Sequence, residues 1–307
     1  MEKIKSIKRM DWRQKVLLSI LGSFLVIMSL LFYITYYYFV DKVEEGNEKV
    51  VLMTFEQAEK DLQNILKNAE LCLDKYMTDD LVWKFVHEYP DTEAERSSMK
   101  IGITDEFTSE MSVNREISSL GILCGNGFGI VSSSFRKNRT GYTAFSDKFQ
   151  KVLADSKANY PYTTWLPGWE LGLEESSPFS VMLQNAGLIG IKAMGENEAL
   201  EEECFLLVSI GKTNIQNTYN AVAFNDSVAV LVDGKDQIIS NVGEEKLGEK
   251  YVSGEDTQNI EYPLELYGWK LCNMIPKADY MKDANDIRNF GLSIILIAIL
   301  ATAVVAV

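Results

Sequence analysis

The 307-residue sequence carries 30 basic and 44 acidic side chains, a formal net charge of −14, and 47% of its residues are apolar. This apolar content is enough to bury a core, so the sequence is not that of a disordered protein. His87 is the single histidine, which excludes a metal site built on several histidines, and we expect neither a metal nor a cofactor. The acidic balance argues against nucleic-acid binding, because acidic side chains repel phosphate.

The basic groups gather at the amino terminus. Residues 1–15 hold six basic against two acidic side chains, and residues 16–39 contain no charged residue. Such a run is long enough to span a bilayer. A cleaved signal peptide is the alternative, but its apolar region is about 7–15 residues long and ends at a small-residue cleavage site. We therefore predict an uncleaved membrane helix at residues 16–39 and a cytoplasmic segment at residues 1–15, because basic flanks stay inside.

A second uncharged run occupies residues 290–307. No basic flank follows it, so we expect a second membrane helix that the sequence cuts off, and a longer protein, rather than a chain that ends inside the bilayer. The intervening residues 40–289 have a net charge of −18. A strongly acidic surface suits the extracellular region of a two-pass protein of the cell membrane.

A stalk helix is predicted at residues 40–78. Residues 41–76 contain no proline, and their apolar residues recur in alternating steps of four and three, the period of a heptad seam. The series is Val51, Phe55, Ala58, Leu62, Ile65, Ala69, Cys72 and Tyr76. The first five residues are candidates for the seam of a homodimer, but a helix that packs on its own domain needs the same apolar stripe.

Beyond the stalk, the pattern changes to short apolar runs separated by turn residues, which predicts an α+β arrangement. A membrane-distal subdomain is expected at residues 79–222 and a membrane-proximal one at residues 223–286. The distal elements are predicted as strands at residues 118–124, 128–134, 179–183 and 204–210, with a helix at residues 143–156. The proximal strands are predicted at residues 228–232, 237–240, 257–262 and 266–275. Asp233-Gly234 supplies a hairpin turn able to hold a positive φ.

Two runs of the proximal segment resemble a known family. The sequence VAVLVDGKDQIISNVGEEKLGEKY, followed by YPLELYGWKLCNMIPKADY ahead of the second apolar run, is similar to the membrane-proximal half of a double Cache domain. That family carries a D-x-x-G-x-I-I-S…G hairpin and a late GW-x-L…IP strand. The resemblance extends, by element order, over residues 16–307. It implies an α+β fold in which a long N-terminal stalk helix holds two PAS-like antiparallel sheets between two transmembrane helices.

The wider arrangement resembles the extracellular region of bacterial transmembrane receptors, and most of all YesM-type sensor histidine kinases. Relatives join the same region to AraC-type regulators, chemotaxis receptors or cyclic-dinucleotide enzymes. The resemblance implies a ligand-sensing region of a two-component histidine kinase whose output domain lies outside this sequence. An AraC-type regulator or a chemoreceptor is the alternative, and an anchored extracellular enzyme or a structural adaptor is a further one.

The sequence offers little for catalysis, and we expect the region given not to be an enzyme. His87 has no second histidine to complete a metalloprotease motif, and the acidic runs are typical of solvated loops. Four cysteines follow the first apolar run: Cys72, Cys124, Cys204 and Cys272. They could form disulfides in an oxidising space, but three lie in apolar strand runs, which favours buried thiols. Spacing alone cannot define a pairing.

The best candidate for a ligand site is the stretch at residues 136–169, which combines basic and aromatic side chains. The candidates are Arg136, Arg139, Tyr142, Tyr160, Tyr162, Trp165 and Trp169. Aromatic walls bury apolar surface and arginine fixes an anionic group, as a small-molecule pocket requires. The alternative is that the tryptophans belong to a core. A sugar, an amino acid, a small carboxylate or a solute-binding protein is the expected partner.

Overall fold

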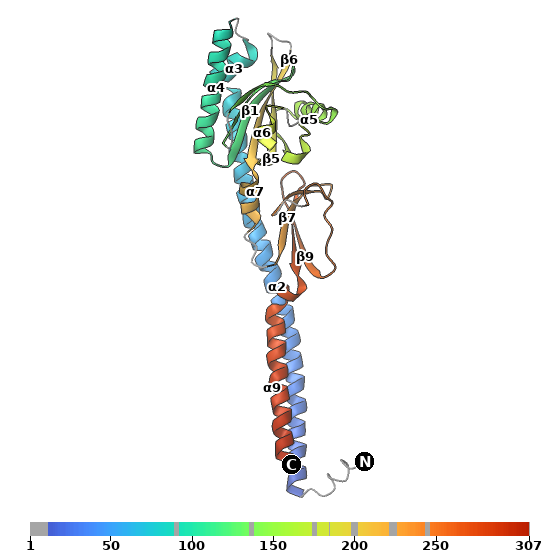
Figure 1. Ribbon diagram of the computed structural model, residues 1–307. Coiled ribbons are helices and arrows are strands. Elements are labelled where there is room, and N and C mark those ends of the chain that lie inside the picture. The colour runs from blue at the N-terminus through green and yellow to red at the C-terminus, as the bar shows by residue number, and fades with distance from the viewer. Residues whose placement is uncertain are drawn as a thin grey trace.

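The computed structural model describes residues 12–88, 92–134, 138–173, 177–183, 185–197, 202–220, 226–242 and 246–306. One helix, α2 (Trp12–Met77), runs the length of the molecule and carries two antiparallel sheets on its upper part (Figure 1). The predicted membrane helix and the predicted stalk therefore form one unbroken helix. The second apolar run belongs to α9 (Lys282–Ala306), which lies beside the lower part of α2.

The distal sheet has six strands in the order β3-β2-β1-β6-β5-β4, and every neighbouring pair is antiparallel. The strands are β1 (Ile117–Cys124), β2 (Phe128–Ser133), β3 (Arg139–Tyr142), β4 (Thr164–Pro167), β5 (Ala186–Asn197) and β6 (Glu202–Gly211). Central strands β1 and β6 are buried along most of their length, because their side chains meet a layer of helices on each face. A strand that is buried on both faces needs apolar residues at nearly every position, which explains the nearly continuous apolar runs in these strands.

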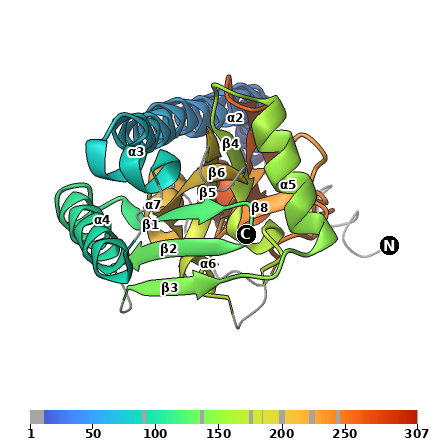
Figure 2. The same ribbon diagram turned by 90° about the horizontal axis from the view of Figure 1, so that it is seen from above.

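Helices cover both faces of the distal sheet (Figure 2). On one face α2 packs on β5 and β6, and α4 (Glu93–Val113) packs on β1 and β2, with α3 (Asp80–His87) between them. On the other face lie α5 (Asp147–Ala158), the turn η1 (Gly168–Glu170) and α6 (Ser180–Leu183). We call these the stalk face and the outer face.

The proximal sheet has four strands in the order β8-β7-β10-β9, again all antiparallel. They are β7 (Val228–Val232), β8 (Ile238–Asn241), β9 (Thr257–Pro263) and β10 (Lys270–Pro276). The connecting helix α7 (Lys212–Tyr219) leaves β6 and packs on α2 and β8, so it joins the two sheets along the stalk. After β10, the short α8 (Lys277–Tyr280) leads directly into α9.

Two local predictions need correction. Residues 93–113 form α4, although we predicted short apolar runs there. Thr92 caps this helix by accepting from the Glu95 backbone N–H, and its hydroxyl bonds the Glu95 carboxylate, so the Thr-x-x-Glu capping signal was present in the sequence. Residues 180–183 form the helix α6 instead of a strand, because one apolar turn has no distinctive period.

The proximal hairpin turn also differs from its prediction. The residue with positive φ is Asp236, at 63°, and Gly234 does not need that freedom. The cause is Asp233, whose Oδ1 accepts from the backbone N–H groups of Lys235 and Gln237 and so fixes a longer turn.

The predicted dimer seam is filled by the chain's own sheets. Val51, Phe55, Ala58 and Leu62 are each at most 1% exposed, and Ile65 packs against the same core. Residues of both sheets share this core with the stalk. Along these residues the apolar face of the stalk therefore cannot contact a second stalk. The heptad period allowed either a dimer seam or packing on the chain's own sheets, and the structure shows the packing on its own sheets.

Candidate functional site

The predicted ligand residues do not meet in one pocket. Arg139 and Tyr142 lie on β3 at one edge of the distal sheet, and both are exposed. Trp165 lies on β4 at the opposite edge. Tyr160 and Tyr162, in the loop between α5 and β4, are 57% and 72% exposed. Arg136 lies outside the described residues.

The two tryptophans have different surroundings, one in a core and one at a cavity. Trp165 is 8% exposed and belongs to the stalk-face core, where its Nε1–H donates to Glu70 Oε1 over 2.9 Å. Trp169, in η1, is 37% exposed and lines a cavity, with the Lys148 ammonium 5.6 Å from its ring centroid. Of the predicted ligand residues in the described part of the chain, Trp169 alone lines that cavity.

The outer face of the distal sheet is filled by the chain's own side chains. The Phe179 ring lies over Gly121 and Gly129: a Cβ added at Gly129 would overlap the ring, and one added at Gly121 would be in tight contact with it. Phe149, Leu153 and Met182 complete this core. The nearby hydroxyls of Thr143 and Ser177 hydrogen-bond to each other. No signal in the sequence indicated that Phe179 and its neighbours would fill this face of the sheet.

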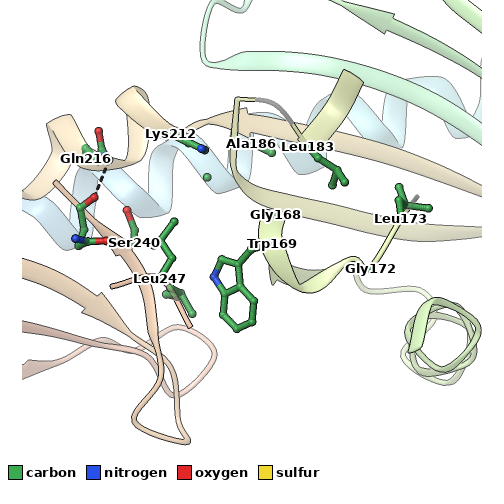
Figure 3. A pocket seen from close by; sticks show the side chains of 13 residues that line it. Gly168, Trp169, Gly172, Leu173, Leu183, Ala186, Lys212, Gln216, Ser240 and Leu247 are labelled. Atoms are coloured by element: carbon green, nitrogen blue, oxygen red, sulfur yellow. Dashed lines mark hydrogen bonds between the residues drawn. The ribbon is translucent and has the colours of Figure 1, made fainter. Parts of the chain in front are cut away.

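A cavity of about 170 Å³ lies between the two sheets (Figure 3). We call it the junction pocket. Trp169 and Leu183 come from the distal subdomain, Lys212 and Gln216 from α7, and Leu247 from the proximal subdomain. By volume it could hold a solute of roughly six non-hydrogen atoms, similar to an engineered cavity that binds benzene.

The polar groups of the junction pocket come from α7 and β8. Gln216 Nε2 donates to the Asn241 carbonyl over 2.8 Å, and the hydroxyls of Tyr219 and Ser240 lie 2.6 Å apart. Asn241 is 5% exposed, and its Oδ1 has no hydrogen-bond partner among the described residues. A buried acceptor without a donor favours a ligand or water that supplies one. The pocket therefore combines an aromatic wall with the polar side chains of Lys212, Gln216 and Ser240.

Trp169 also touches the proximal subdomain. Its ring lies against Gly248, whose φ of +80° requires glycine or a strained residue. Because η1 follows β4 directly, Trp169 joins the edge of the distal sheet to the loop at Leu247 and Gly248. Sequence reasoning singled out Trp169 but had no signal for the loop that it contacts.

Stalk carboxylates tie the sheets to α2, among them Asp74, which forms an ion pair with Lys192 of β5. Glu70 Oε1 accepts from Trp165 Nε1–H of the distal sheet and from the Tyr267 hydroxyl of the proximal β9–β10 turn, over 2.9 and 3.0 Å. Glu59, 7% exposed, accepts from the Tyr262 hydroxyl and the Glu265 backbone N–H, over 2.9 and 2.7 Å. Glu70 is thus a single point of contact among stalk, distal sheet and proximal sheet.

Tyr267 reaches Glu70 through an unusual turn. Its φ is +52°, in the left-handed region that costs a non-glycine residue about 1–2 kcal/mol. Burial, with the Glu70 carboxylate, raises the pKa of the Tyr267 hydroxyl, so the hydroxyl remains a donor across the physiological range. The Tyr-Gly-Trp sequence at this turn is part of the run that carried the family resemblance, but the Glu70 contact had no signal in the sequence.

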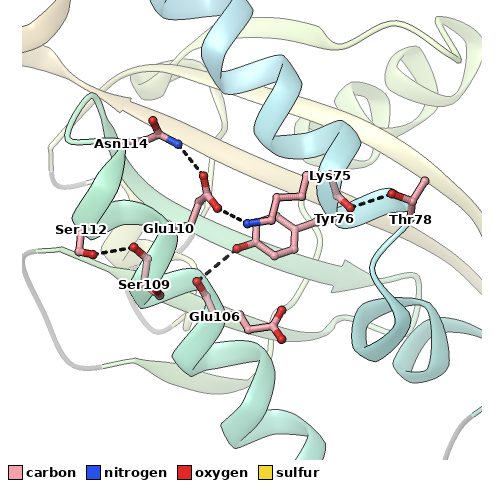
Figure 4. Close-up of polar contacts among 8 residues, drawn as sticks. All are labelled: Lys75, Tyr76, Thr78, Glu106, Ser109, Glu110, Ser112 and Asn114. Carbon is pink, nitrogen blue, oxygen red and sulfur yellow. Dashed lines mark hydrogen bonds and ion pairs between the residues drawn. The ribbon is translucent and has the colours of Figure 1, made fainter.

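Polar contacts fix the top of the stalk to α4 (Figure 4). Lys75 forms an ion pair with Glu110, which also accepts from Asn114 Nδ2. The Tyr76 hydroxyl donates to the Glu106 carbonyl over 3.2 Å. The Glu110 carboxylate raises the pKa of the Lys75 ammonium. These contacts hold the distal subdomain rigidly on the end of α2.

At the other end, the proximal sheet is attached to the stalk just above the apolar helices. The Tyr280 hydroxyl donates to the Glu44 carbonyl over 2.9 Å, and Asn47 Nδ2 donates to the Tyr280 carbonyl over 2.6 Å. Below them, α2 and α9 approach so closely that a side chain at Gly291 would overlap the Phe32 ring. A displacement of β10 along the stalk therefore acts on α9 through a few residues.

In the part of the chain that the structure describes, two helices are long and apolar enough to cross a membrane, one within Lys15–Met77 and one at Lys282–Thr302. Within the described residues, no group of three or more histidine, cysteine or acidic side chains could hold a metal ion. A wider hollow of about 490 Å³ lies between α4 and β3, where Lys100, Asp105 and Thr140 are among its lining residues.

Comparison with known proteins identifies the fold. No protein-family model and no curated protein matches the sequence. Solved structures do match: the sensory domain of the Campylobacter jejuni chemoreceptor Tlp3 with isoleucine bound has a TM-score of 0.51 at 11% identity, over 80% of this chain and 98% of that one. The chain has the fold of a Cache-like sensory domain. This confirms the predicted α+β fold of a long N-terminal helix and two antiparallel sheets.

Extracellular domains of two candidate histidine kinases are also similar. The soHK1S-Z6 domain has a TM-score of 0.55 at 10% identity and covers 79% of this chain and 98% of its own. The vpHK1S-Z8 domain has a TM-score of 0.54 at 11% identity and covers 80% of this chain and 99% of its own. At these identities the likeness concerns the fold, and the fold is one that extracellular sensory domains of membrane receptors use.

Proposed function

We propose that the chain is the extracellular ligand-sensing region of a transmembrane receptor, with residues 1–15 in the cytoplasm and residues 40–289 outside. The observation that carries this proposal is the position of the sensory fold between two helices able to span a membrane. Because α2 carries both sheets and α9 follows the proximal sheet, a ligand-dependent shift between the sheets is passed to the helix pair. A ligand that binds one arrangement better shifts the population toward it.

The proposed output is a two-component histidine kinase of the YesM type, which the proximal sequence runs resemble. The similar folds of candidate histidine kinases support it. A chemoreceptor is the second candidate, because the Tlp3 chemoreceptor shares the fold. In either case the region described here would bind and transmit, and enzymatic activity would belong to a cytoplasmic domain.

The proposed ligand site is the junction pocket. The outer face of the distal sheet is occupied by Phe179 and its neighbours, as a structural adaptor would require, whereas the junction pocket is open and is lined by Trp169, Lys212 and Gln216. Its size limits the ligand to a small polar solute, such as a small amino acid, a small carboxylic acid or a fragment of a sugar. A solute inserted there would separate Trp169 from Leu247 and move the sheets apart.

The test is a thermal-shift screen of residues 1–307 in lipid nanodiscs against glycine, alanine, acetate, lactate and simple sugars. A specific binder raises the melting temperature in a concentration-dependent way. We expect Trp169→Ala to weaken binding at least tenfold. Trp83→Ala is the matched control, because Trp83 is 44% exposed on α3 and does not line the pocket.

Two results would contradict the proposal. If no solute raises the melting temperature of the folded chain, the small-solute site is wrong and a protein partner or an adaptor is favoured. If a solute binds but Trp169→Ala and Trp83→Ala respond equally, the ligand site lies elsewhere and the sensor proposal stands without the junction pocket.

A further inference from the structure

Cys124 and Cys204 face each other across the two central strands of the distal sheet. They are directly paired in the antiparallel register of β1 and β6. Their sulfur atoms lie 3.1 Å apart, and the residues are 2% and 0% exposed. Both side chains belong to the stalk-face core.

The register makes this pair suited to a covalent bond. The backbone N–H of Gly125 donates to the Glu203 carbonyl over 2.7 Å, so Gly125 and Glu203 form a hydrogen-bonded pair. The adjacent pair, Cys124 and Cys204, is therefore a non-hydrogen-bonded one, in which the Cα atoms approach to about 4.5 Å. That spacing falls inside the range of disulfides, and the sulfurs need to approach by only about 1 Å to reach bonding distance.

We propose that Cys124 and Cys204 form a disulfide in the mature protein, which joins β1 to β6 at the end of the distal sheet far from the membrane. The proposal rests on the extracellular location given under Proposed function, because disulfides persist in oxidising compartments. Two S–H bonds break and one S–S bond forms. The two electrons and two protons pass to the disulfide of an extracytoplasmic thiol oxidoreductase, which is reduced to a dithiol by exchange.

The other two cysteines are expected to remain thiols. Cys72 lies on the stalk and Cys272 on β10 of the proximal sheet. Burial raises the pKa of each thiol to about 12, so little of the reactive thiolate is present in the folded protein. The proposal thus predicts one disulfide and two thiols among the four cysteines.

The test counts thiols in the chain purified from membranes after acid quenching and alkylation with N-ethylmaleimide in denaturant. We expect two alkylated cysteines before reduction and four after it, with a peptide pair linking Cys124 to Cys204 by mass spectrometry. Cys204→Ser should raise the unreduced count to three, whereas the matched control Cys272→Ser should lower it to one. Because the protein is denatured for counting, the result does not depend on the stability of a variant.

Four alkylated cysteines before reduction would overturn the proposal. A second label separates this failure from a failure of the proposed location. A Tyr160→Cys variant places a thiol on an exposed loop, and a membrane-impermeant maleimide applied to intact cells reaches it if the domain is outside. Labelling together with four free native thiols would refute the disulfide alone. Absence of labelling would instead refute the extracellular location on which both proposals depend.

Discussion

The distal and proximal sheets lie on the same helix but are supported differently. The six-stranded distal sheet has helices on both faces and a core on each side. The four-stranded proximal sheet packs one face on the stalk, and its other face has a small core of Val230, Val232, Ile238, Tyr251 and Cys272. Less apolar burial means less stabilisation, at about 25 cal/mol per Å².

The buried polar groups of the distal sheet are also better paired than those of the proximal sheet. In the distal sheet the hydroxyls of Ser118 and Ser209 pair over 2.7 Å, and Ser156 donates to the Ile191 carbonyl. The exception there is the buried Thr163 hydroxyl beside β4, which has no partner among the described residues. In the proximal sheet Asn273 is fully buried, and neither its Nδ2 nor its Oδ1 has a partner among the described residues. An unpaired buried amide costs about 1–3 kcal/mol.

This contrast assigns different tasks to the two sheets. A sheet with two cores and mostly paired buried polar groups is suited to hold a fixed shape, whereas a sheet with an unsatisfied buried amide opens at a lower cost in free energy. The proximal sheet is also the one connected directly to α9. We therefore infer that the distal subdomain serves as a fixed platform and that the proximal sheet moves on the stalk.

The largest effect is expected from emptying the distal core. Phe179→Ala removes a fully buried ring that covers Gly121 and Gly129, so it should lower the free energy of unfolding by about 3–5 kcal/mol. Urea unfolding followed by tryptophan fluorescence measures the loss. The exposed Tyr142→Ala is the control and should change it by less than about 0.5 kcal/mol. A loss below about 1 kcal/mol for Phe179→Ala would mean that the outer face is loosely packed.

A change of opposite sign is expected in the proximal sheet. Asn273→Leu replaces the unpaired amide by an apolar side chain of similar size and should raise the free energy of unfolding by about 1–3 kcal/mol. Ser209→Ala in the distal sheet is the matched comparison, because it leaves the Ser118 hydroxyl without this partner and should destabilise. Destabilisation by both substitutions, measured by urea unfolding, would remove the contrast between the sheets.

A smaller effect tests the link between the sheets. The substitution Tyr267→Phe removes the hydrogen bond to Glu70 and should lower the free energy of unfolding by about 1 kcal/mol. The same substitution in a Glu70→Ala background should cost nothing further, because the acceptor is already absent. A double-mutant cycle on unfolding free energies measures this coupling. Simple additivity would show that Glu70 does not join the proximal turn to the stalk.

The smallest effect concerns pH at the top of the stalk. Partial burial, and then the Asp79 carboxylate, raise the pKa of Glu106 above its usual value. The folded state therefore holds this proton more tightly than the unfolded state, and the ionisation of Glu106 lowers stability as pH rises through this range. The substitution Glu106→Gln should raise the free energy of unfolding by less than about 0.5 kcal/mol at pH 7 and should leave it unchanged at pH 3. Thermal unfolding measures this change. A lower stability of the variant at pH 7 would contradict the expected direction.

Sequence periodicity predicted the parts of the fold that have long, regular patterns. The two apolar runs, the stalk and strands such as β1, β6 and β7 follow from the spacing of apolar residues alone. The helix α4 was missed because its apolar residues are sparse, with Ile103, Phe107 and Met111 as the buried positions. The dimer seam could not be distinguished from intramolecular packing, since both bury one stripe of a helix.

The candidate site was less predictable than the fold. Trp169 was found because aromatic residues near basic ones are a local signal, but Lys212, Gln216 and Asn241 join it only through the packing of α7 between the sheets. Likewise, Glu70 is one of many acidic residues on a polar helix surface, and nothing local distinguishes it. Contacts between segments that are about a hundred residues apart in sequence leave no periodic trace.

Hydrogen–deuterium exchange of the whole chain in lipid nanodiscs tests the central claim most directly. It compares the backbone amides of β1 and β6 with those of β7 and β10 in the same molecule. We predict that the proximal strands exchange through an opening that costs at least about 2 kcal/mol less than the opening of the distal strands. Equal protection, or greater protection of β7 and β10, would contradict a fixed distal platform and a proximal sheet that moves on the stalk.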